Sequence, residues 1–150
     1  MREHPDHHDA ELLLRLYDLR REARLREARE WYMRDFHAES FADLLKKYPR
    51  GSEDNARFRM VVSYWDMVAS IVNQGLIKEE FFFENTTEFW VVWAKTKPFV
   101  PEAREARKNP HIWSNLEQLA AKYEKWMSNR APEALGELRK IVVEGSSPGR

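Results

Sequence analysis

The most apolar helical pattern of the chain lies at residues 60–72, which read MVVSYWDMVASIV. The polar residues in and beside this segment recur at steps of four and three, so they share one narrow seam along a helix. This polar seam consists of Arg59, Ser63, Asp66, Ser70 and Asn73. A helix that is apolar in every other direction must be covered by several neighbours. The pattern therefore predicts a central, mostly buried helix within an all-α fold.

Length and composition agree with a single domain of this kind. The 150 residues include 25 basic and 25 acidic side chains, so the formal net charge is zero. A chain without net charge has no global field to attract nucleic acid, and it lacks the self-repulsion that opposes self-association. The absence of cysteine excludes disulfides and cysteine-ligated metals. Since 13% of the residues are aromatic, we expect a core built from rings.

The start of the chain is polar and reads MREHPD, so we expect no signal peptide. The longest apolar stretch contains Asp66 and is too short to cross a bilayer. We therefore expect no membrane-spanning segment and a cytoplasmic protein.

Local capping signals mark the ends of the other helices. Asp6 or Asp9 can cap a long, charged first helix that runs to about Phe36. Ser40 opens a short helix, and Gly75 is typical of the residue that follows a helix. Further breaks are expected near Asn85 and at the prolines. The expected architecture is a single irregular bundle of about six to eight helices, with a flexible N-terminus at 1–8, a helical domain at 9–143 and a disordered tail at 144–150.

The apolar residues of the first helix form two stripes that point in different directions. The first stripe contains Leu12, Leu16, Leu19 and Ala23, and Arg20 and Arg24 lie near it. A divided stripe indicates that the helix contacts two different surfaces. We interpret the first stripe and its arginines as an interaction surface for a second copy or for another helical protein. Nucleic-acid binding is a weaker alternative, because acidic residues interrupt the Arg-rich segment.

Asp66 is the most unusual charge, since its helix is otherwise apolar. A carboxylate inside a helical core can serve as a general base or bind a cationic ligand. Alternatively, it faces solvent or pairs with an arginine such as Arg59, Arg104 or Arg107. The second hypothesis is therefore a ligand-binding or enzymatic pocket formed by Asp66, Arg59, Arg104, Trp90 and Trp93.

No pattern in the sequence indicates a metal site or catalysis. His4 and His8 lie one helical turn apart, but a metal site needs three or four fixed ligands. Glu80, Glu84 and Glu88 have the same spacing, which is typical of a solvent-exposed face. The chain contains no Glu-x-x-His and no His-Glu-x-x-His. We expect no metal, no cofactor and no catalytic residue, and we favour a non-enzymatic protein.

A recurring order of packing residues covers the region from about 37 to 126. The residues that carry it are 58–75 (FRMVVSYWDMVASIVNQG), Leu76, Ile77, Trp93, Arg104 and 110–113 (PHIW). This order resembles a bacterial all-helical family known only as a domain of unknown function. The resemblance implies the fold and brings no catalytic residue. Relatives often have a membrane-spanning helix before this domain, whereas this chain has its charged first helix there.

Overall fold

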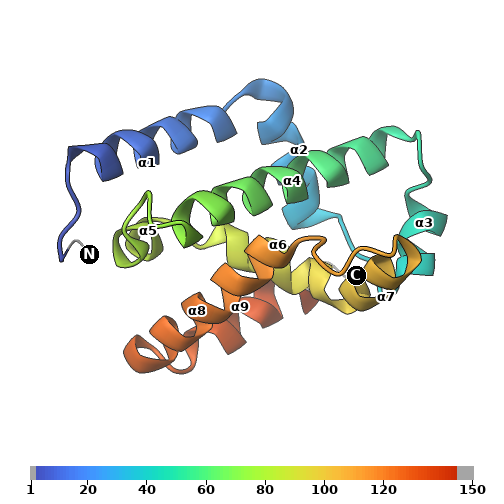
Figure 1. Ribbon diagram of the computed structural model, residues 1–150. Helices are drawn as coiled ribbons and strands as arrows, with labels where there is room; N and C mark the ends of the chain where they lie inside the picture. The colour runs from blue at the N-terminus through green and yellow to red at the C-terminus, as the bar shows by residue number, and fades with distance from the viewer. Residues whose placement is uncertain (1–2, 145–150) are drawn as a thin grey trace.

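The computed structural model describes residues 3–144, and within them the chain is helical without any strand. The helices are α1 (His7–Arg20), α2 (Ala23–Arg34), α3 (Phe41–Lys47), α4 (Glu53–Asn73), α5 (Glu79–Asn85), α6 (Glu88–Thr96), the short 3-10 helix η1 (Lys97–Phe99), α7 (Val100–Ala106), α8 (Ser114–Arg130) and α9 (Ala134–Val142). The predicted all-α bundle is confirmed. Figure 1 shows α1 along the top of the molecule above α4, with α8 and α9 on the opposite side.

Helix α4 is the central helix that the sequence predicts. It packs mainly against α2 and α8, with α5 and α6 completing its cover. Trp65, Val61 and Val68 are almost completely buried. The side chain of Ser52 caps the start of α4. The helix ends at Asn73, and Gly75 follows it with a φ of +81°, a left-handed conformation that glycine adopts without strain.

Aromatic rings fill the core on both sides of α4, as the composition predicts. One group surrounds Phe36 and Phe58, whose ring centroids are 5.3 Å apart. The other surrounds Phe89 and Tyr123, whose centroids are 5.0 Å apart. Such ring pairs pack edge to face or offset, and each pair stabilises the fold by about 1 kcal/mol beyond area burial.

The long first helix expected to reach Phe36 is divided into α1 and α2. At the division, the carboxylate of Glu22 accepts hydrogen bonds from the N–H groups of Arg24 and Leu25 and so caps α2. Neither proline nor glycine marks this break, and glutamate is an uncommon cap. The two apolar stripes therefore belong to two separate helices.

The structure describes most of the expected N-terminal segment but only the first residue of the expected C-terminal tail. Within the segment 1–8, the carboxylate of Asp6 accepts from the N–H groups of His8 and Asp9, and α1 begins at His7. Of the expected tail 144–150, residues 145–150 lie outside the described residues. None of the helices between residues 3 and 144 combines the length and apolar character that crossing a bilayer requires.

The central position of Trp65 leads to a stability prediction. Trp65→Ala removes a ring that is 2% exposed, so we expect the free energy of unfolding to fall by about 3–5 kcal/mol. Urea denaturation followed by circular dichroism measures this loss. Met67→Ala, on the same helix but 46% exposed, is the matched control and should change stability by less than about 0.5 kcal/mol. Equal losses in the two variants would contradict the assigned core.

Candidate functional site

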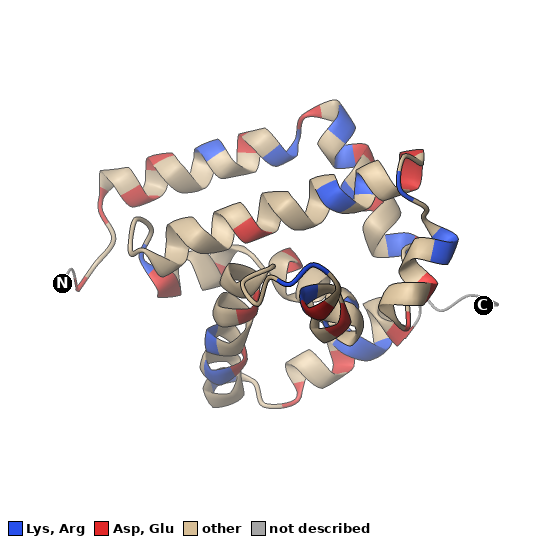
Figure 2. Ribbon diagram, turned by 45° about the vertical axis from the view of Figure 1, so that its right-hand side comes forward, with Lys and Arg blue, Asp and Glu red and all other residues tan. Residues whose placement is uncertain are grey.

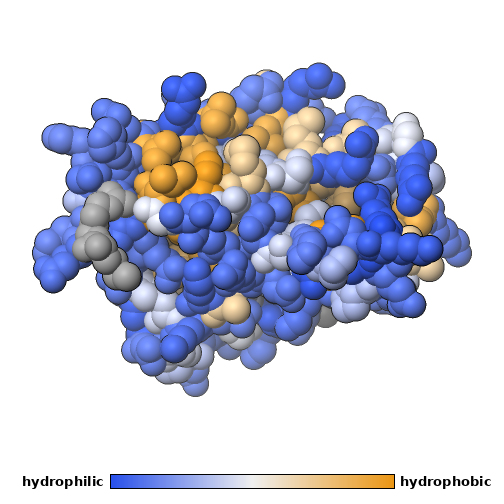
Figure 3. Space-filling model, in the orientation of Figure 1, coloured by the Kyte–Doolittle hydropathy of each residue, from blue (hydrophilic) through white to orange (hydrophobic). Residues whose placement is uncertain are grey.

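An apolar groove lies between α1, α4 and α5, and we call it the α1–α4 groove. Its volume is about 270 Å³. Its lining residues are Leu13, Leu14, Leu16, Tyr17, Arg20, Tyr64, Trp65, Val68, Phe82, Asn85 and Thr86. Figure 3 shows hydrophobic side chains gathered along α1 and α4 on the face that it presents. A concave apolar site with a few polar groups is the usual form of a binding pocket.

Polar contacts fasten α1 beside this groove. The fully buried carboxylate of Asp9 accepts a hydrogen bond from the N–H of Lys78 (2.6 Å), which precedes α5. Further along, the hydroxyl of Tyr64 donates to the carbonyl of Leu16 (2.5 Å). Burial raises the pKa of Tyr64 to about 12, so the hydroxyl keeps the proton that it donates. These contacts fix the wall of the groove that α1 provides.

Glu88 anchors the end of α1 from the start of α6. Its carboxylate accepts two hydrogen bonds from Arg29 (2.7 and 2.9 Å) and one from the indole of Trp65 (3.0 Å). Arg29 also donates to the carbonyl of Arg20 (3.0 Å), the last residue of α1. Burial disfavours the charged form of Arg29, but the hydrogen bonds and charge of Glu88 outweigh burial and raise its pKa. The sequence pattern placed Glu88 on a solvent-exposed face. In the structure its carboxylate instead binds Arg29 and Trp65.

A second hollow of about 380 Å³ adjoins the groove, and we call it the arginine hollow. Tyr17 and Arg20 line both spaces. The other residues of the arginine hollow are Arg21, Arg26, Arg29, Glu30, Met33 and Glu88. The guanidinium of Arg20 lies 4.8 Å from the ring centroid of Tyr17, so an aromatic face holds it in place.

Asp66 caps helix α8 from outside that helix. Its carboxylate accepts from the N–H of Leu116 (2.9 Å) and from the side-chain amide of Asn115 (3.4 Å), in the first turn of α8. The residue before α8 is Trp113, whose side chain provides no cap and whose φ of +56° is unusual for a bulky residue. Asp66 therefore supplies the acceptor that α8 lacks locally.

Part of the polar seam of α4 faces a third hollow of about 830 Å³, between α3, α4 and the segment before α8. Arg59, Ser63 and Asp66 line it, together with Arg107 and His111. Arg59 donates to the side chain of Asn55 (3.1 Å). Of the expected ligand site, the structure brings only Arg59 and Asp66 into this hollow.

Arg104, Trp90 and Trp93 lie elsewhere. Arg104 donates to the carbonyl of Ile112 (2.9 Å) and to Glu117 (3.0 Å), so it holds the segment before α8. Trp90 and Trp93 are buried in the core. Arg104 therefore stabilises the segment before α8, and the two tryptophans pack in the core, outside the hollow that Arg59 and Asp66 line.

The expected interaction stripe is divided between the inside and the outside of the molecule. Leu16 is buried and lines the groove, and Leu12 is partly buried. Leu19 is 47% exposed, and Ala23 and Arg24 are exposed at the start of α2. The sequence did not single out Leu14 and Tyr17, which are 67% and 46% exposed. The exposed apolar residues of α1 therefore differ from the expected stripe.

Lys95 is a buried charge that sequence reasoning missed. Its ammonium donates to the carbonyls of Tyr32 (2.6 Å) and Met33 (3.2 Å), in the last turn of α2. Burial lowers the pKa of Lys95 to about 8, and the charge of Asp35 acts in the opposite direction. A cation at the end of a helix interacts favourably with the helix dipole. The run of apolar residues before Lys95 was the available signal for its burial.

Within residues 3–144, no group of three or more His, Asp or Glu side chains is arranged to hold a metal ion. The family described as Domain of unknown function (DUF4760) matches residues 5–126, and the chain therefore belongs to this family. The match includes α1 and α2, which precede the region from about 37 to 126 that carries the resemblance. No curated protein and no solved structure gives a significant match.

The cap that Asp66 provides leads to a second prediction. Asp66→Ala leaves the N–H of Leu116 without its acceptor, so we expect a loss of about 1 kcal/mol in the free energy of unfolding. Amide hydrogen exchange should also become faster at Leu116. Ser63→Ala, an exposed change on the same seam, is the control. Unchanged exchange at Leu116 in Asp66→Ala would show that the cap has no energetic role.

The burial of Lys95 predicts a dependence of stability on pH. Between pH 8 and about 10.4, the unfolded chain keeps the lysine proton while the folded chain loses it. The contribution of Lys95 to stability then rises with pH, because at this residue the unfolded state binds more protons. We expect the native protein to gain roughly 3 kcal/mol relative to Lys95→Met across this window. Denaturation at several pH values measures the gain, and the exposed Lys97→Met is the control. A constant difference between native protein and Lys95→Met would contradict this prediction.

Proposed function

We propose that this protein is a non-enzymatic interaction module that self-associates through α1. The observation that carries the proposal is the exposure of large apolar side chains on this helix. Leu14, Leu19 and Tyr17 are 67%, 47% and 46% exposed. Helix α1 lies at the outer edge of the molecule, where another molecule can reach it (Figure 1). Leu14 and Tyr17 lie one helical turn apart, and exposed apolar side chains that adjoin one another are typical of interaction surfaces.

The attachment of α1 to the rest of the molecule supports this role. Asp9 holds its start, Tyr64 holds its middle and Arg29 holds its end through backbone contacts. A helix fixed at three points presents its outer side chains in a defined arrangement, so binding does not have to order it.

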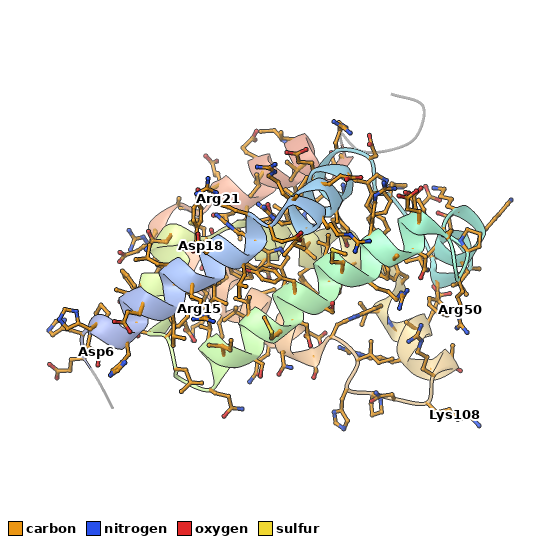
Figure 4. All side chains as sticks on the ribbon, turned by 90° about the horizontal axis from the view of Figure 1, so that it is seen from above. Asp6, Arg15, Asp18, Arg21, Arg50 and Lys108 are labelled. Carbon is orange, nitrogen blue, oxygen red and sulfur yellow. The ribbon has the colours of Figure 1, made fainter. Side chains whose placement is uncertain are left out.

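The charge pattern of α1 favours a second copy as the partner. Asp6 lies just before α1 and Glu11 lies in its first half, whereas Arg20, Arg21 and Arg24 lie at or just after its end. Figure 4 shows Asp6 at the start of α1 and Arg21 at the turn toward α2. Two copies of α1 packed antiparallel around a two-fold axis place each acidic start near the other's basic end. The formal net charge of zero also leaves little global repulsion between copies.

Two other hypotheses are less well supported. A ligand site in the hollow lined by Arg59 and Asp66 is the first alternative, and the size of that hollow supports it. Nucleic-acid binding is weaker, because Arg29 is paired with Glu88. Charges of both signs also alternate along the helices (Figure 2). A bacterial source and a cytoplasmic location of the protein remain predictions.

Self-association is tested by light scattering coupled to size exclusion across a concentration series. We expect a dimer whose dissociation constant rises at least about tenfold in Leu14→Glu and in Leu19→Glu, because each change places a charge in the contact. High salt should weaken the dimer through screening of its charged pairs.

Ile141→Glu is the matched control, since Ile141 is 70% exposed but lies on α9. It should dimerise like the native protein. A native protein that stays monomeric at millimolar concentration would overturn the proposal. A dimer weakened equally by Ile141→Glu would show that α1 is not the contact.

A further inference from the structure

We propose that the α1–α4 groove binds a free amphiphile in which an apolar chain carries an anionic head. The chain lies in the groove, and the head binds Arg20 at the entrance to the arginine hollow. This site is assigned to a small molecule, and its evidence is separate from that for self-association, although Leu14 and Tyr17 of the exposed face of α1 also line the groove. The proposal rests on three features, which are the apolar walls, the position of Arg20 and the charge of the adjoining hollow.

The walls of the groove suit an apolar chain. Leu13 and Leu16 of α1 face Val68 of α4 and Phe82 of α5 across it. The volume of about 270 Å³ is slightly smaller than that of typical pockets for drug-sized ligands, which start at about 300 Å³. A narrow apolar space of this kind accommodates a single chain and removes its surface from water, which drives binding.

Arg20 lies where the groove meets the arginine hollow. Its guanidinium lies over the ring of Tyr17 (4.8 Å) and near that of Trp65 (5.9 Å). Throughout residues 3–144, no carboxylate lies within salt-bridge distance of the guanidinium of Arg20, Arg21 or Arg26. The guanidinium of Arg20 is thus positioned by aromatic faces, and its N–H donors can bind a carboxylate or phosphate.

The charge of the arginine hollow complements an anion. Four arginines line it, at positions 20, 21, 26 and 29, against the two carboxylates of Glu30 and Glu88. Glu88 is already paired with Arg29. The four arginines and two glutamates give the hollow a net charge of +2, and it lies at the end of an apolar groove. This combination of an apolar channel and a cationic end matches the two parts of an anionic amphiphile.

A free amphiphile explains these features better than a membrane surface. Binding to an anionic membrane needs a broad basic face. The helices instead carry acidic and basic residues side by side (Figure 2). The cationic group is local, and it adjoins a narrow apolar groove.

Isothermal titration calorimetry with decanoate below its micelle concentration tests the proposal. We expect the native protein to bind decanoate with measurable heat and not to bind acetate, which lacks the chain. Arg20→Gln should weaken decanoate binding at least about tenfold, while binding of decan-1-ol stays within about twofold. Arg50→Gln, an exposed change between α3 and α4, is the matched control and should bind decanoate as the native protein does.

Leu13→Trp fills the groove, so it should abolish binding of both decanoate and decan-1-ol. Circular dichroism checks that each variant keeps its helices. The assignment is overturned if the native protein gives no heat with decanoate at millimolar concentration, or if Arg20→Gln binds it as tightly as the native protein. Tighter binding to phosphatidylglycerol vesicles than to monomeric decanoate would also overturn it and would identify a membrane surface as the target.

Discussion

Helix α4 keeps its rings from water because other helices cover every side of it except the strip that carries Arg59, Ser63 and Met67. The apolar pattern at residues 60–72 leaves no broad face that a regular two-layer arrangement would satisfy. The chain meets this requirement with α2 and α8 and with the shorter α5 and α6, which all contact α4. Short helices have many ends, and every end has backbone groups without partners inside its own helix. Burying α4 therefore creates a second requirement, which is to satisfy these ends within the fold.

Side chains from distant helices meet that second requirement. Asp9 of α1 accepts from the N–H before α5, and Asp66 of α4 accepts from the first turn of α8. At the C-terminal ends of helices, Lys95 donates to a carbonyl in the last turn of α2, and Arg29 donates to the last carbonyl of α1. Carboxylates lie at helix starts and cations at helix ends, which is the arrangement that the helix dipole favours.

The sequence predicts those parts of the structure whose causes are local. The periodicity of α4, the cap at Ser40 and the end at Gly75 each involve residues within a few positions of one another, and all are found. The break after Arg20 was missed, because glutamate at position 22 is not a usual cap. The α1–α4 groove was missed as well, since the register of α1 against α4 decides which leucines point inward. Asp66 was recognised as unusual, but its partner is a backbone N–H fifty positions away rather than an arginine.

The origin of the cap on α8 has a consequence for how the protein folds. The first turn of α8 gains its hydrogen bond only after a loop of about fifty residues has closed, and loop closure costs entropy before the contact repays it. The cap therefore couples the start of α8 to the docking of α4. Trp113 adds to this coupling, because its left-handed backbone is sparsely populated by bulky residues and its ring packs against Phe58 of α4 (5.9 Å) and Phe99 (6.1 Å).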